Sequence, residues 1–193
     1  MSIDTDTTDL TGTTAELRQA AIDHLWQHNR DWESAARDNE PLIFVSGDGI
    51  RVTDSDGQTW IDVNGGYSSV NIGYGRTEIA EAAFEQLKRI PYFPQGSANP
   101  PTIRLAAKLA ELAPGTLNRA FPVSGGSLAN ETALKIARAY HKRRGHDGRF
   151  RLISRRGSYH GATGGVLFLG STPATPRTDY EPGPPGMVYA PQP

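Results

Sequence analysis

The sequence predicts an α/β fold, and three observations lead to that prediction. A short apolar segment at residues 119–123 runs into the glycine turn Ser124-Gly-Gly-Ser127. The next residues have helical periodicity, with one face formed by Ala129, Ala133, Ile136, Ala137 and Tyr140. A second apolar segment follows at residues 150–153. Strand, helix and strand in this order predict a right-handed crossover within a parallel sheet.

The glycine turn at residues 124–127 has the properties of a phosphate site. Glycines let a ligand approach the backbone closely, and the N-terminus of a helix offers N–H groups and partial positive charge. The Ser127 hydroxyl adds a donor. The sequence has neither a P-loop nor a G-x-G-x-x-G fingerprint. The alternative is that Gly125 and Gly126 only make a tight strand-to-helix turn.

A second motif, Ser158-Tyr-His-Gly161, follows the second apolar segment. Open α/β sheets bind ligands at the carboxyl ends of their strands, so Tyr159 and His160 are expected near Ser127. The Tyr159 ring is suited to stacking on a planar cofactor. The alternatives are an ordinary half-buried loop aromatic at 159 and a hydrogen-bonded structural histidine at 160.

The other elements are predicted from periodicity and turn residues. Helices are expected at residues 15–30, 76–89 and 101–112, and short strands at 43–46, 50–54 and 59–63. Residues 166–169 open a helix or short strand, and the proline- and glycine-rich residues 170–193 predict an extended loop. Residues 1–14, rich in Thr and Asp, are expected to be disordered.

The order and spacing of the motifs resemble those of class III aminotransferases, which are pyridoxal-phosphate enzymes of fold type I. The resemblance covers roughly residues 41–193. The matching segments are DSDGQTWID (54–62), NIGYG (71–75), LAAKLAELAP (105–114), VSGGSLANETALK (123–135) and SYHG (158–161). Composition and the resemblance together predict three parts: the disordered residues 1–14, an N-terminal helix and hairpin segment (15–75), and the start of the large cofactor-binding α/β domain (76–193), truncated at 193.

The resemblance also implies a role for each residue of the two motifs. Gly126 and Ser127 hold the cofactor phosphate, and Tyr159 stacks on the pyridine ring. His160 and Gly161 shape the same turn.

Two further roles follow from the resemblance, together with one departure from the family pattern. Glu131, just inside the helix, is a carboxylate that supports the residues around the cofactor without binding the cofactor itself. Tyr67 lines the substrate pocket. Leu128 replaces the usual glutamate of the family, which removes an acid from the first helical turn.

No catalytic residue is assigned, because the Schiff-base lysine of the family is absent from this chain. All four lysines fall within helical patterns: Lys88, Lys108, Lys135 and Lys142. Pyridoxal-phosphate catalysis also needs an acid at the pyridine nitrogen, and the family places both groups downstream of Pro193. The chain is therefore expected to be the N-terminal part of a longer enzyme, inactive by itself.

The resemblance predicts amino-group transfer from an amine or ω-amino acid to a keto acid such as pyruvate, by a homodimer. Two alternatives stay open: an aminomutase that uses the same cofactor, and a non-catalytic α/β domain that binds a phosphorylated ligand through residues 124–127. A strand-end acid and a lysine loop after residue 193 would distinguish an enzyme from a binding domain.

Composition limits the possible partners and the compartment. A formal net charge of −1 gives no electrostatic reason to expect a nucleic acid or an anionic membrane as partner. The chain has no cysteine, which fits the cytoplasm, and no secretory signal or apolar membrane segment is recognised. His141 and His146 lack acidic or cysteine partners at a metal-ligand spacing, so no metal site is expected.

Overall fold

The computed structural model describes residues 12–27, 31–37, 41–94, 96–170 and 177–192. These residues form two compact units, Met1–Ser97 and Ala98–Pro193. The contacts group residues 76–97 with the first unit, so the expected start of a large domain at residue 76 stays a prediction about the family architecture. Most of the segment expected to be disordered, residues 1–11, lies outside the described part, but the expectation was wrong for Thr13 and Thr14, which cap and begin a helix.

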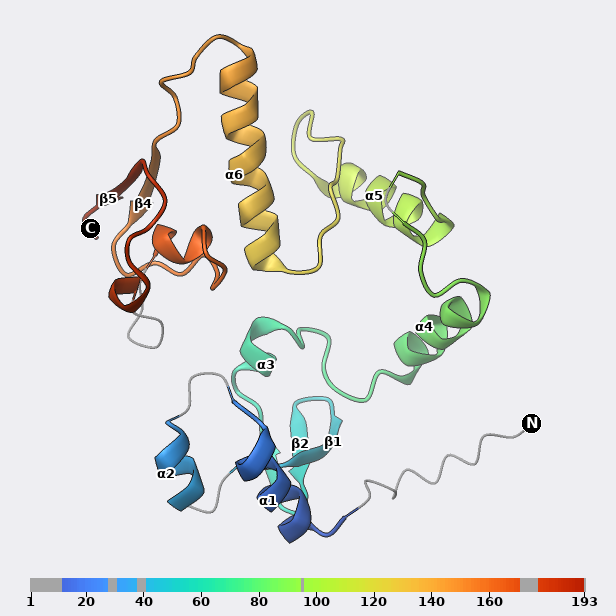
Figure 1. Cartoon of the computed structure of the whole chain (residues 1–193). Coiled ribbons are helices and arrows are strands. Elements are labelled where there is room, and N and C mark those ends of the chain that lie inside the picture. The colour runs from blue at the N-terminus through green and yellow to red at the C-terminus, as the bar shows by residue number, and fades with distance from the viewer. Residues whose placement is uncertain (1–11, 28–30, 38–40, 95, 171–176, 193) are drawn as a thin grey trace. The chain divides into compact units, whose positions relative to one another are not determined.

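The first unit contains an antiparallel meander of three strands in the order β1, β2, β3 (Figure 1). The strands are β1 (Phe44–Asp48), β2 (Arg51–Asp54) and β3 (Thr59–Ile61). Gly49 and Gly57, with φ of 55° and 82°, lie in the two hairpin turns, where L-residues are disfavoured. The three predicted strands are confirmed, with ends that shift by one or two residues.

Three right-handed helices accompany this sheet: α1 (Thr14–His24), α2 (Trp32–Arg37) and α4 (Thr77–Arg89). A capping box begins α1, because the Thr13 side chain accepts from the Glu16 amide while the Glu16 carboxylate accepts from the Thr13 amide. The predicted helix at 15–30 ends early, with Leu25 as its C-cap, and its last residues, 28–30, lie outside the described part. Pattern analysis did not predict α2.

A short left-handed turn, α3 (Gly65–Ser68), follows β3. Gly66 and Tyr67 have φ, ψ angles of 57°, 48° and 55°, 44°, and Ser68 has φ of 65°. Tyr67 and Ser68 are the only non-glycine residues with positive φ in the described part of the chain. This conformation costs L-residues about 1–2 kcal/mol each, so surrounding contacts must hold it.

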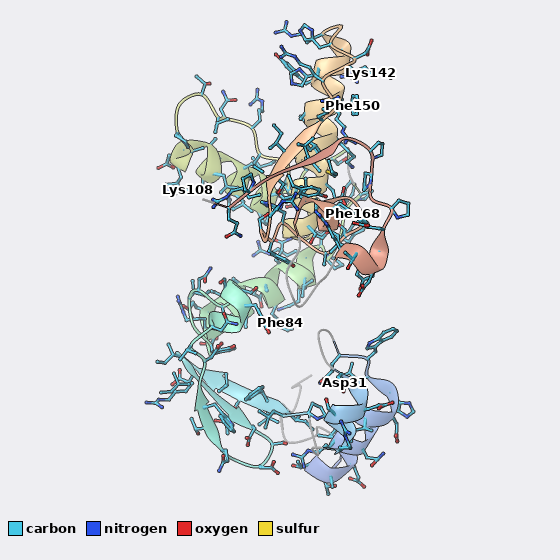
Figure 2. The ribbon with its side chains drawn as sticks, turned by 90° about the vertical axis from the view of Figure 1, so that its left-hand side faces the viewer. Asp31, Phe84, Lys108, Lys142, Phe150 and Phe168 are labelled. Carbon is cyan, nitrogen blue, oxygen red and sulfur yellow. The ribbon has the colours of Figure 1, made fainter. Side chains whose placement is uncertain are left out.

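The second unit contains helices α5 (Pro100–Leu112) and α6 (Gly126–Arg143), strands β4 (Leu152–Arg155) and β5 (Met187–Ala190), and the 3-10 turns η1 (Val166–Leu169) and η2 (Arg177–Tyr180). β4 and β5 pair in parallel, in register from Leu152–Met187 to Arg155–Ala190. All four residues of η1 are buried, and η1 contacts both β4 and α6. Phe168 of η1 is labelled in Figure 2.

Two predictions for the second unit were wrong. Residues 119–123 do not form a strand: Phe121 is exposed, and within the described residues the sheet of this unit contains only β4 and β5. A strand needs a hydrogen-bonded neighbour, and Pro122 has no N–H to donate to one. The predicted loop at 170–193 contains η2 and β5, because β4 supplies the neighbour that β5 pairs with.

The buried carboxylate of Asp54 organises the turn between β2 and β3. It accepts hydrogen bonds from the Trp60 indole at 2.7 Å and from the amides of Gln58 and Asp56 at 2.8 and 3.0 Å. The indole bond is the largest influence on the pKa of Asp54; together with the two amide bonds it outweighs the opposing effect of burial and lowers that pKa.

We expect the stabilising effect of Asp54 to depend on pH. Because the folded-state pKa is lowered, the effect is fully present above the unfolded aspartate value of about 3.9 and is lost as the pH falls through the folded value. Urea unfolding from pH 7 to pH 3 measures it: the stability advantage of the native protein over Asp54→Asn should shrink at acid pH. The exposed Asp48→Asn serves as control, and a pH-independent advantage would contradict the prediction.

Candidate functional site

The N-terminus of α6 carries the glycine turn. Gly125 is extended, with φ of 175°, and neither Gly125 nor Gly126 has a left-handed backbone. A Cβ atom added at either position would meet nothing within 4 Å among the described residues. Backbone conformation and packing within this unit therefore do not explain the two glycines. Their missing side chains leave the first amides of a long helix open to an approaching group, which suits an anion.

Ser127, in the first turn of α6, contributes a hydroxyl beside these amides. Its Oγ accepts a hydrogen bond from the Ala162 amide at 3.2 Å. A hydroxyl has one proton and two lone pairs, so the Ser127 proton remains available as a donor. The Ala162 bond restricts the Ser127 rotamer and so orients that donor.

Three side chains on one face of α6 bind a single loop, residues 160–166. They are Ser127, Asn130 and Glu131, at positions i, i+3 and i+4, which share a helical face. Asn130 Nδ2 donates to the His160 carbonyl at 2.7 Å. The structure thus brings the SYHG motif against the N-terminus of α6, as the sequence predicted.

Glu131 makes the largest set of contacts to this loop. Its Oε1 accepts from Thr163 Oγ1 at 2.9 Å and from the amides of Gly165 and Val166 at 2.8 and 3.2 Å. Burial raises the pKa of Glu131, but these three hydrogen bonds outweigh it and hold the pKa below its usual value. The carboxylate is therefore ionised at neutral pH and supports the loop from the side of α6.

Two glycines allow the loop to approach α6 this closely. A Cβ at Gly161 would lie 2.5 Å from Ser127 Oγ and 2.7 Å from a methyl group of Val166, and φ is +137° there. A Cβ at Gly165 would collide with the Glu131 carboxylate. Gly161 thus owes its identity to the Ser127 contact.

The side chains of Tyr159 and His160 face solvent within this unit. Tyr159 is 64% exposed, so the alternative of a half-buried loop aromatic does not describe it. His160 is exposed too, and its backbone carbonyl makes the contact with Asn130. Tyr67 lies in the first unit, on the left-handed turn, and is 85% exposed there. Both tyrosine rings are accessible for stacking.

Sequence reasoning missed Asn130, Thr163 and Gly165 as parts of this arrangement. The signal for Asn130 was its position three residues after Ser127, on the face that also carries Glu131. The signal for the loop was the run Gly161-Ala-Thr-Gly-Gly165, which is small and glycine-rich and directly precedes four apolar residues.

The lysines lie where the sequence predicted them. Lys88 is in α4, Lys108 in α5, and Lys135 and Lys142 in α6. Within the described ranges, no three acidic or histidine side chains are placed to hold a metal ion. Among the helices that the structure describes, none has both the length and the apolar character needed to cross a membrane.

Comparison with known proteins identifies the family. The family model for class-III aminotransferases matches residues 33–193. The chain belongs to the class-III aminotransferases. It is 45% identical over 155 residues to the aminotransferase YhxA of Bacillus subtilis (80% of this chain, 34% of the relative). It is 38% identical over 154 residues to the taurine–pyruvate aminotransferase of Bilophila wadsworthia (79% of this chain, 33% of the relative).

The same family appears among solved structures. An (S)-enantioselective omega-transaminase from Thermomicrobium roseum superimposes with a TM-score of 0.90 at 41% identity, covering 94% of this chain and 41% of the other. The fold is therefore that of fold type I, and class-III aminotransferases depend on pyridoxal phosphate. This aminotransferase chain spans between 33% and 41% of the length of these three relatives.

A substitution at Gly161 tests how closely the loop and α6 must approach. Gly161→Ala should push residues 160–162 away from Ser127 and destabilise the protein by about 1–3 kcal/mol, through the clash and the strained φ. Urea unfolding measures the loss. Gly164→Ala is the matched control in the same loop, because its Cβ meets nothing within 4 Å. Equal stability of the two variants would contradict the prediction.

Proposed function

We propose that the protein is a pyridoxal-phosphate-dependent aminotransferase that moves an amino group from an amine or ω-amino acid to a keto acid such as pyruvate. The observation that carries the proposal is that the open N-terminus of α6 lies against the loop that follows Tyr159. Hydrogen bonds of Ser127, Asn130 and Glu131 hold the helix and this loop together. Membership of the class-III family supports it.

The glycine turn at residues 124–127, at the start of α6, suits the phosphate of this cofactor. The amides of Gly126 and Ser127 and the Ser127 hydroxyl would bind the phosphate, and the exposed ring of Tyr159 would stack on the pyridine ring. His160 and Gly161 would shape the turn that carries Tyr159. When bound, the cofactor supplies an electron sink for the bond changes at the amine carbon.

Two more residues support the site in this proposal. Glu131 would act on the site indirectly, by positioning the loop through Thr163, Gly165 and Val166. Tyr67 would line the pocket for the amine substrate, since its ring is accessible. The catalytic lysine and the acid at the pyridine nitrogen are expected outside this chain.

We propose that the intact protein is a cytoplasmic homodimer, without nucleic acid or membrane partners. The family resemblance supports the dimer, and the lack of cysteine suits a reducing compartment. Multi-angle light scattering after size exclusion should give twice the mass of the intact polypeptide. A monomer at micromolar concentration would contradict the dimer.

The function is tested on the intact protein with added pyridoxal phosphate. We expect transfer of the amino group from an amine to pyruvate, detected as alanine. Ser127→Ala should weaken cofactor binding about tenfold or more, because hydrogen bonds to charged groups contribute roughly 1.5–3 kcal/mol each. Equilibrium dialysis against the cofactor measures this loss.

Two variants serve as controls. Thr116→Val removes an exposed hydroxyl in the loop that precedes the glycine turn and should leave cofactor affinity unchanged. Asn130→Ala removes another contact to the same loop but no phosphate donor, so it should weaken binding less than Ser127→Ala does. Cofactor binding without transfer from any of a series of amines would favour the aminomutase or the binding-only alternative.

A further inference from the structure

The left-handed turn α3 presents Tyr67 beside a groove in the first unit. The groove has a volume of about 650 Å³. Aromatic and aliphatic side chains line much of it, among them Phe44, Trp60, Ile61, Tyr67 and Tyr74. A groove of this kind suits an apolar substituent of a small molecule. The unfavourable backbone of Tyr67 and Ser68 is thus placed at a surface that suits a ligand.

The carboxylate of Asp62 holds the turn in this conformation. Oδ1 accepts from the Asn64 amide at 3.0 Å, and Oδ2 accepts from the Gly66 amide at 2.7 Å. Oδ2 also accepts from the Tyr74 hydroxyl at 2.8 Å. The Gly66 amide within the turn and the Asn64 amide just before it are thus bonded to one side chain, which directly follows β3.

Tyr74 connects that carboxylate to the sheet. Its N–H donates to the Gly49 carbonyl at 2.8 Å, and its carbonyl accepts from the Gly49 amide at 3.2 Å. Its side chain packs on Gly47, where a Cβ would lie 2.7 Å from Tyr74 Cγ. The position of the Tyr74 hydroxyl, and with it Asp62, is therefore set by the β1–β2 hairpin.

The protonation states of Asp62 and Tyr74 favour the hydrogen bond between them at neutral pH. The hydrogen bond from the Tyr74 hydroxyl makes the largest contribution to lowering the pKa of Asp62, and the bonds from the Asn64 and Gly66 amides lower it further. The Asp62 carboxylate in turn raises the pKa of Tyr74. A neutral phenol thus donates to an ionised carboxylate, which is a stronger bond than one between neutral groups.

We propose that Asp62 and Tyr74 are positioning residues that set which amine donors the enzyme accepts. They hold Gly65–Ser68 left-handed and so fix the Tyr67 ring at the edge of the groove, where it meets the apolar substituent of the amine. The inference rests on the proposed aminotransferase function and on the role of Tyr67 in it.

The test compares two amine donors, 1-phenylethylamine and β-alanine, with pyruvate as acceptor and the intact holoenzyme as catalyst. Tyr74→Phe removes only the phenolic oxygen, and Asp62→Asn removes the charge. Each should change the ratio of kcat/KM between the two amines on the order of tenfold, because a shift of about 1 Å in a positioning group has effects of this size or larger. The KM for pyruvate should stay unchanged.

Matched variants separate positioning from general destabilisation. Tyr92→Phe and Asp48→Asn make the same chemical changes at exposed positions of the first unit and should leave the ratio unchanged. In a double-mutant cycle, Tyr74→Phe should have no further effect on the ratio once Tyr67 is replaced by alanine. Amide hydrogen exchange at Gly66 should be faster in Tyr74→Phe than in the native enzyme, whether or not substrate is present.

The possible failures are distinct. An intact holoenzyme that transfers no amino group from either amine contradicts the proposed function. An active enzyme whose ratio is unchanged in Tyr74→Phe and Asp62→Asn overturns the inference alone. An equal loss for both amines, or an effect that persists in the Tyr67→Ala background, also overturns it, because the pair would then act on stability and not through Tyr67.

Discussion

The hydrogen bonds of the Glu131 carboxylate are the interaction on which the candidate site in the second unit depends. One oxygen binds a hydroxyl and two backbone amides of a single short segment, Thr163–Val166. That segment continues directly into η1, the buried part of this unit. Amides left without an acceptor cost free energy, so the loop conformation and the core beneath it are stabilised together. The SYHG motif lies just before this segment and makes its own contact with α6 through the bond from Asn130 to the His160 carbonyl.

Close packing is the second condition for the site. The helix face that carries Ser127 and Glu131 leaves no room for a Cβ at Gly161 or Gly165. At Gly125 and Gly126 the opposite holds, since the space beside them is open. The glycines of this region therefore serve two physical purposes. One pair lets the loop pack closely on α6, and the other leaves the first backbone amides of α6 open, as the proposed phosphate site requires.

Among the described residues of the first unit, two carboxylates likewise accept two backbone amides each. Asp54 organises the turn between β2 and β3, and Asp62 organises the left-handed turn that follows β3. In all three cases the pKa of the carboxyl group is lowered, so the ionised form that accepts hydrogen bonds is the one present at neutral pH. Each acid holds a short irregular segment that has no ladder or helix to satisfy its amides.

Local pattern was sufficient for the elements whose contacts are local. The hairpin glycines, the apolar periodicity of α4, α5 and α6, and the order of the family motifs were all readable from the sequence, and the structure places the lysines in the predicted helices. Tertiary contacts decided the rest. The pairing of β5 with β4, the unpaired residues 119–123, the bonds of Thr163 and Gly165 to Glu131 and the left-handed backbone of Tyr67 were missed or misassigned. Each depends on which distant segment supplies a hydrogen-bond partner, and no local preference of the chain encodes that choice.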